Sequence, residues 1–129
     1  MPKTEITVVK EFEFEAAHYL PDYDGPCKRM HGHSYRLQVG MTGSINPKTG
    51  MVIDFSKLKK LVGEFVDFMD HECLNTIKSN AFPAMMPTAE YMVLWLSLKL
   101  TSFLRQEEPR LTFIRLYETP TSYAEWRAE

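Results

Sequence analysis

The chain has 129 residues, the length of one domain, and 44% of them are hydrophobic, as in an ordinary soluble globular protein. A formal net charge of -2 argues against a protein that coats nucleic acid, and two cysteines are too few for a secreted disulfide framework. The start of the chain lacks a signal-peptide pattern, and the longest apolar run, 91–100, is too short to cross a bilayer. We therefore expect one domain over residues 1–129, in the cytoplasm, with reduced thiols and without membrane or nucleic-acid partners.

The first half of the chain begins with two predicted strands. A strand is expected over 5–15, where Phe12 to Glu15 alternate between apolar and charged side chains. A loop rich in Pro and Gly follows at 20–26. A second strand is predicted over 33–42 because its apolar side chains recur with a period of two. These side chains, expected on one face, are Tyr35, Leu37, Val39 and Met41.

A hairpin and a helix are predicted next. Residues 46–50, with the sequence NPKTG, predict a turn, and 51–55 predicts a strand that pairs back in an antiparallel hairpin. A helix is expected over 56–69, and either Asp54 or Ser56 can cap its first turn. Its apolar residues recur at helical spacing, and they are Leu58, Leu61, Val62, Phe65 and Met69.

The second half of the chain predicts another helix and a closing strand. The helix is expected after Pro87, with Thr88 as its cap and Glu90 in its first turn, where a carboxylate suits the helix dipole. Its centre, MVLWLSL, is apolar on almost every side, so it needs cover on both flanks, for example from a sheet and from another subunit. A strand over 111–117 completes an α+β domain with an antiparallel sheet and helices on one face. The free edges of such a sheet favour oligomerisation.

The segment His31-Gly32-His33 is the densest chemical signal in the chain. Residues two apart on a strand project from one face, so both imidazoles can reach the same ion. His18 ends the first strand and is the candidate third ligand, because an adjacent antiparallel strand would place it beside the pair. Three nitrogen ligands with a fourth position open are typical of catalytic zinc. The alternative is two surface histidines on a strand, and the spacing alone does not decide between these interpretations.

Cys27 lies just before the histidine pair, in a loop with two cations, Lys28 and Arg29. Those cations would lower the pKa of the thiol and raise the fraction of thiolate. A thiolate at this place can act as a base, or it can be a fourth zinc ligand that makes the site closed and structural. The number of ligands therefore separates an enzyme from a structural module.

Three further side chains are candidates with ordinary alternatives. Asp70 next to His71 can fix the tautomer of the imidazole for proton transfer. The alternative is an ordinary histidine at a helix C-terminus, where the negative end of the helix dipole favours it. Glu118 follows the last strand, where a solvent-facing carboxylate is ordinary. If the site binds a pterin or guanine, this carboxylate can accept two parallel hydrogen bonds from the ring N–H and the exocyclic amino group.

Taken together, these motifs resemble the 6-pyruvoyltetrahydropterin synthase family. The resemblance runs nearly from end to end and is carried by FEFEAAHYL, CKRMHGHSYRL, TG…MVIDF, DH…LN, PTAE and the final YET. Three residues separate Cys27 from His31, and this short spacing is similar to the 6-carboxytetrahydropterin branch of bacterial queuosine (7-deazaguanine) biosynthesis. The stretch 80–87 is longer and more apolar than the family leads us to expect.

The resemblance implies a tunnelling fold, or T-fold, with a four-stranded antiparallel sheet, two helices on one face, and an oligomeric barrel. A homohexamer built as a dimer of trimers is implied, with active sites at subunit interfaces. The cofactor implied is Zn2+. Its implied ligands are His18, His31 and His33.

The resemblance also implies roles for the remaining candidates. Cys27 would be a base rather than a ligand, Asp70 and His71 a proton-transfer pair, and Glu118 the anchor of the pterin. The implied lyase reaction converts 7,8-dihydroneopterin triphosphate into 6-carboxy-5,6,7,8-tetrahydropterin, with loss of triphosphate and acetaldehyde. The alternatives are 6-pyruvoyltetrahydropterin synthase activity and a non-catalytic module that binds zinc or pterin.

Overall fold

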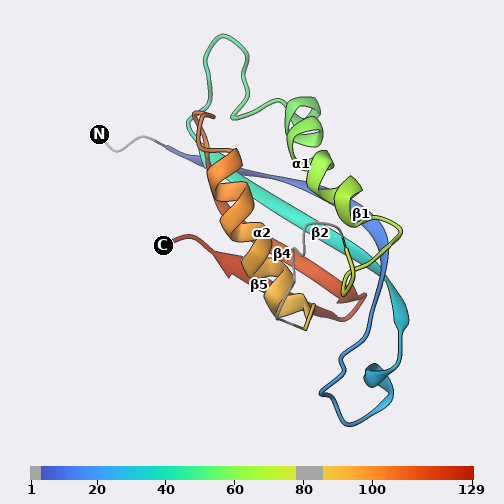
Figure 1. Cartoon of the computed structure of the whole chain (residues 1–129). Coiled ribbons are helices and arrows are strands. Elements are labelled where there is room, and N and C mark those ends of the chain that lie inside the picture. Colours follow the sequence, from blue (N-terminus) through green and yellow to red (C-terminus); the bar gives the residue numbers. More distant parts are fainter. Residues whose placement is uncertain (1–3, 78–85) are drawn as a thin grey trace.

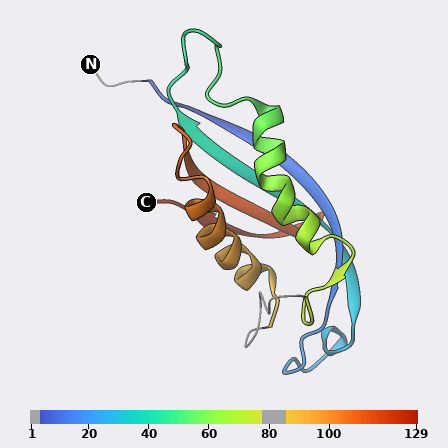
Figure 2. The same cartoon turned by 45° about the horizontal axis from the view of Figure 1, so that its top comes forward.

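The structure, a computed structural model, describes residues 4–77 and 86–129, so most of the stretch 80–87 lies outside the described residues. A five-stranded sheet in the order β3-β1-β2-β4-β5 forms one layer of the described part, and two helices form the other. Figures 1 and 2 show both helices on the same face of the sheet, as predicted. The strands are β1 (Ile6–His18), β2 (His31–Gly43), β3 (Glu72–Cys73), β4 (Arg110–Thr119) and β5 (Ser122–Arg127), and the helices are α1 (Phe55–Met69) and α2 (Ala89–Phe103). Neither helix has the length and apolar character needed to span a membrane.

The sheet differs from the predicted four antiparallel strands in two ways. β5 is an additional strand at the edge of the sheet, paired antiparallel to β4. β3 is only two residues long and pairs parallel to β1, through Ala16 with Glu72 and Ala17 with Cys73, so the sheet is mixed. A two-residue strand has no periodicity to read, and β5 follows β4 through a turn so short that the two appear as one segment in the sequence.

The predicted strand over 51–55 is wrong. Met51 makes only an isolated antiparallel bridge with Asn46, and α1 already begins at Phe55. The Asp54 side chain accepts a hydrogen bond from the Ser56 N–H at 2.8 Å, so Asp54 is the cap and its backbone is extended. An N-cap accepts hydrogen bonds from backbone amides that the first turn of a helix leaves unpaired. The Asp54 cap therefore favours the start of α1 at Phe55, inside the segment that was predicted to be a strand.

The core lies between the sheet and the helices, where the period of two in β2 places its apolar side chains. Tyr35, Leu37, Val39 and Met41 are all buried, as the alternation predicts. α2 is capped by Thr88, as predicted, because its hydroxyl accepts from the Tyr91 N–H at 3.2 Å. The outer flank of α2 leaves large apolar side chains exposed in the described chain, namely Tyr91, Leu94 and Leu98.

Replacing Gly40 by alanine is expected to destabilise the protein by about 1–3 kcal/mol, because overpacking forces side chains off their preferred rotamers. A Cβ built on Gly40 would overlap the aromatic ring of Phe113 on the neighbouring strand. Urea unfolding measures the effect. Gly63→Ala is the matched control: Gly63 lies in α1 with no atom within 4 Å of an added Cβ, so alanine should stabilise the helix. Equal shifts in both variants would contradict this account of Gly40.

Candidate functional site

Three histidines converge at the end of the β1–β2 pair. In the antiparallel register His18 lies opposite His31, and Ala16 lies opposite His33. His31 and His33 therefore project from the same face as Tyr35, toward the helix side of the sheet. The Nε2 atoms of His18 and His31 are 3.0 Å apart, and one ring nitrogen of each histidine lies within 4.8 Å of the others. The predicted strand pairing of these three residues is confirmed.

The hydrogen bonds of the outer ring nitrogens determine which nitrogens are free. His18 Nδ1 donates to the carbonyl of Pro87 at 2.8 Å, and His31 Nδ1 donates to the carbonyl of Arg29 at 2.7 Å. A carbonyl oxygen only accepts, so each neutral ring keeps its proton on Nδ1 and turns an Nε2 lone pair inward. Two lone pairs at 3.0 Å repel each other unless a cation lies between them. This donor set fits a metal ion, with backbone carbonyls orienting two ligands from behind.

The protonation state of the cluster suits metal binding. Burial lowers the pKa of His18, although its hydrogen bond to Pro87 and the charge of Glu118 oppose this effect. Burial also lowers the pKa of His33, again against the charge of Glu118. Neutral imidazole is the form that binds a metal ion, so protons compete weakly for these two rings near neutral pH.

Glu118 joins the cluster from β4, far along the chain. Its Oε1 lies 3.4 Å from His18 Nε2 and 3.6 Å from His33 Nε2. It also lines a hollow with Ala89 at the start of α2 and Ser122 at the start of β5. The carboxylate therefore stands between the histidine cluster and an open space, where it can accept hydrogen bonds from a bound ring.

Cys27 lies outside the histidine cluster. It sits half-buried in a short 3₁₀ helix, Pro26–Lys28, within the loop that joins β1 to β2. Among the described residues, the group whose ligand atoms all approach within 4.8 Å consists of the three histidines without this thiol. The geometry gives no support to a fourth, thiolate ligand.

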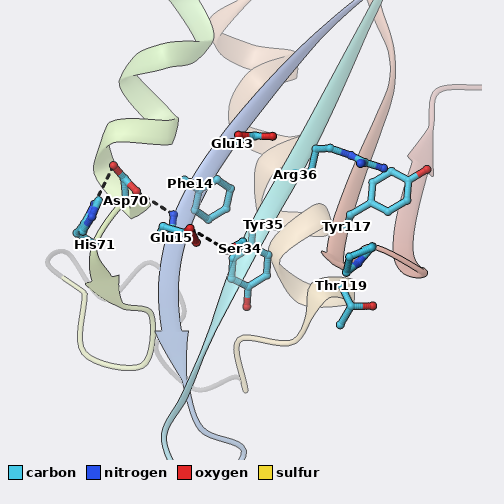
Figure 3. A pocket seen from close by; sticks show the side chains of 11 residues that line it. Glu13, Phe14, Glu15, Ser34, Tyr35, Arg36, Asp70, His71, Tyr117 and Thr119 are labelled. Carbon is cyan, nitrogen blue, oxygen red and sulfur yellow. Dashed lines mark hydrogen bonds and ion pairs between the residues drawn. The ribbon is translucent and has the colours of Figure 1, made fainter.

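Asp70 and His71 form a pair at the end of α1, beside the edge of β1 (Figure 3). Asp70 ends α1, its Oδ1 accepts from the Glu15 N–H at 2.8 Å, and its Oδ2 lies 3.0 Å from His71 Nδ1. They line a cavity of about 480 Å³ on the helix-free face, with Ser34 and Arg36. Within the described residues, no hydrogen bond or ion pair joins either member to the histidine cluster.

Replacing Asp70 by asparagine is expected to destabilise the protein at pH 7 more than at pH 3. The N–H of Glu15 and then His71 hold the pKa of the Asp70 carboxyl below its usual value. A depressed pKa stabilises the fold above the unfolded pKa of about 3.9, and this stabilisation is lost as the pH falls through the folded pKa. Unfolding free energies of both proteins across this pH range measure it, with Asp67→Asn on the exposed side of α1 as control. A difference independent of pH would refute the linkage.

The sequence interpretation assigned Tyr35 to the core and missed its place beneath the cluster. Its side chain is 1% exposed, and its hydroxyl lies 3.4 Å from His18 Nδ1. Burial and the charge of Glu118 raise the pKa of this phenol, so it stays protonated. The available signal was its position, two residues after His33 on the same strand face.

Comparisons with known proteins agree with this geometry. Residues 7–129 match the family model described as 6-pyruvoyl tetrahydropterin synthase. The chain is 35% identical to the 6-carboxy-5,6,7,8-tetrahydropterin synthase of Haemophilus influenzae, covering 93% of this chain and 97% of the relative. It is 37% identical to the enzyme of the same name from Synechocystis, covering 92% and 91% respectively. A solved structure of Caenorhabditis elegans 6-pyruvoyl tetrahydropterin synthase superposes with a TM-score of 0.87 at 26% identity, covering 100% of this chain and 99% of that one.

Proposed function

The chain belongs to the 6-pyruvoyl tetrahydropterin synthase family, and from this membership we propose that it acts as a zinc-dependent 6-carboxy-5,6,7,8-tetrahydropterin synthase. The proposed lyase reaction converts 7,8-dihydroneopterin triphosphate and one molecule of water into 6-carboxy-5,6,7,8-tetrahydropterin, triphosphate and acetaldehyde. We place it in queuosine biosynthesis in the cytoplasm. The observation that supports this proposal best is the convergence of three histidines beside a carboxylate in a chain with such relatives.

His18, His31 and His33 are the residues that would hold the metal. A bound zinc ion supplies Lewis acidity that polarises the hydroxyl oxygens of a substrate side chain. Glu118, next to the cluster, would bind the pterin through its ring N–H and amino group, which orients the side chain of the substrate toward the histidines.

Proton transfer falls to Cys27 and to the Asp70–His71 pair. The Cys27 thiolate would remove a proton from the substrate side chain. Asp70 holds His71 through Nδ1, which leaves His71 Nε2 to exchange protons on the opposite side of the same carbon. Fixing both groups around one carbon lowers the barrier by positioning alone.

A homo-oligomer, proposed as a hexamer built from two trimers, explains how these groups would meet. The histidine cluster lies on the helix side of the sheet, whereas Asp70 and His71 lie at its β1 edge and, among the described residues, make no hydrogen bond or ion pair with the cluster. The His71 side chain is 78% exposed, so it is available to a neighbouring subunit. We propose that a second chain supplies the proton-transfer pair to each cluster.

Product analysis tests the reaction directly. The purified protein, loaded with zinc, is incubated with 7,8-dihydroneopterin triphosphate, and the products are identified by mass. We expect 6-carboxytetrahydropterin together with acetaldehyde. A pyruvoyl product would instead assign 6-pyruvoyltetrahydropterin synthase activity, and a bound but unchanged pterin would assign a binding module.

Replacing Glu118 by glutamine is expected to raise KM by about tenfold with a smaller effect on kcat. A charge-assisted hydrogen bond is worth roughly 1.5–3 kcal/mol, and an amide keeps only one acceptor oxygen. Steady-state kinetics measure the change, with Glu64→Gln on the exposed side of α1 as the control. An unchanged affinity for the pterin would remove Glu118 from the binding site.

A further inference from the structure

The loop that carries Cys27 runs from Tyr19 to Met30, between the last residue of β1 and the first residue of β2. Its two sides are joined by a backbone hydrogen bond from the Leu20 N–H to the Cys27 carbonyl, at 2.8 Å. Because of this bond, a shift of the backbone at the start of the loop moves the backbone of Cys27 as well.

One side chain from outside the loop holds its first residue. The Asn75 Oδ1 accepts from the Tyr19 N–H at 3.0 Å, and the Asn75 Nδ2 donates to the Tyr19 carbonyl at 2.9 Å. Both atoms belong to one planar amide, which carries a donor and an acceptor side by side. In the described part of the chain, no other side chain beyond the loop and its flanking histidines hydrogen-bonds to the loop.

Asn75 continues a ladder that starts at the Asp70–His71 pair. The His71 N–H donates to the Glu15 carbonyl, and the Leu74 N–H donates to the Ala17 carbonyl at 2.8 Å. The amide of Asn75 reaches Tyr19, which follows Glu15 and Ala17 in this alternating series and lies one residue beyond β1. A single stretch therefore fixes the end of β1, with His18 on it, and the entry to the loop of Cys27.

We propose that Asn75 is a positioning residue, which holds the Cys27 loop in register with the turn that carries Asp70 and His71. It acts through the backbone of Tyr19 and touches no reacting atom. The expected fall in kcat rests on the proposed function, in which Cys27 is the base. The expected change in the position of the Cys27 loop is independent of the proposed function, because it follows from the two hydrogen bonds between Asn75 and Tyr19.

The test compares Asn75→Ala with Asn46→Ala, both made in a Cys73→Ser background. Cys27 is then the single thiol of the chain. Asn46 is a matched control, because its Oδ1 accepts from the Lys48 N–H at 2.9 Å in a turn at the far end of the sheet. The readouts are bound zinc, urea unfolding, the pH dependence of Cys27 alkylation by iodoacetamide without substrate, and kcat and KM.

For Asn75→Ala we expect alkylation of Cys27 to change by about fivefold or more, kcat to fall about tenfold, and KM to stay within about twofold. The control should keep the alkylation profile and kcat of the background. If Asn75→Ala does not fold, Asn75→Asp replaces it, since the carboxylate keeps the acceptor for the Tyr19 N–H and loses the donor.

The outcomes separate the positioning role from the proposed reaction. An unchanged alkylation profile in a destabilised Asn75 variant would reduce Asn75 to a structural residue and overturn the inference, whatever the protein catalyses. A changed profile in a protein that forms no pterin product would support the positioning role while the proposed reaction fails.

Discussion

Replacing His33 by alanine is expected to abolish stoichiometric zinc binding and to lower turnover by about a thousandfold or more. One of three ring nitrogens is lost, and Lewis-acid stabilisation by a bound metal is worth several kcal/mol, at about 1.4 kcal/mol for each factor of ten. His33 is the ligand of choice for this test because its side chain is 19% exposed, whereas that of His18 is 1% exposed. The fold should survive its removal. Metal analysis per chain and product formation are the measurements.

His71→Ala is the matched control for the metal. It removes an imidazole that lies outside the cluster of converging nitrogens, so the variant should keep its zinc while losing turnover. Chelation of the wild-type protein should reproduce the His33→Ala result, and added zinc should restore activity. Full zinc occupancy in His33→Ala, or full activity after complete metal removal, would refute the proposed metal centre.

Replacing Cys27 by alanine is expected to leave the zinc in place and to lower kcat by about a hundredfold or more. General acid–base catalysis by one positioned side chain typically contributes a factor of 100 to 10,000. The thiol lies outside the cluster of ligand atoms, so its removal leaves three nitrogen ligands intact. Zinc content and single-turnover rates with the substrate measure the two effects separately.

The Cys73→Ser variant controls for the loss of any thiol. Cys73 is half-buried in β3 and takes no part in the proposed chemistry, so this variant should keep both zinc and turnover. Loss of zinc from Cys27→Ala would instead identify the thiolate as a ligand and the site as closed. Unchanged turnover in Cys27→Ala would remove the thiol from the reaction.

The elements that the sequence predicted well are those with a local physical signal. The period of two over 33–42 predicted which side chains of β2 are buried, and Thr88 predicted where α2 begins. For α1 the sequence offered Asp54 and Ser56 as caps, and the structure has Asp54, one residue before Phe55. These signals arise from hydrogen bonds and burial among residues a few positions apart. The local sequence pattern is therefore enough to predict them.

The two errors have different physical causes. β3 forms because Glu72 and Cys73, which follow the turn after α1, pair with the edge of β1. Nothing in the composition of these two residues predicts a strand. The segment 51–55 has the composition of a strand, but it lies at a turn and leads straight into the cap of α1. A tertiary contact therefore accounts for β3, whereas at 51–55 the local cap at Asp54 prevailed over the local strand propensity.

The amino-acid sequence predicted the His31–His33 pair, and the strand pairing inferred from it placed His18 beside that pair. It did not predict that Glu118 joins these histidines or that Asp70 and His71 bond to the Glu15 backbone at the edge of β1, since both depend on the three-dimensional arrangement. The physical reason is that a pattern of alternation defines two faces of a strand. Which distant strand or helix end arrives at either face depends on strand order and register, which the alternation does not encode.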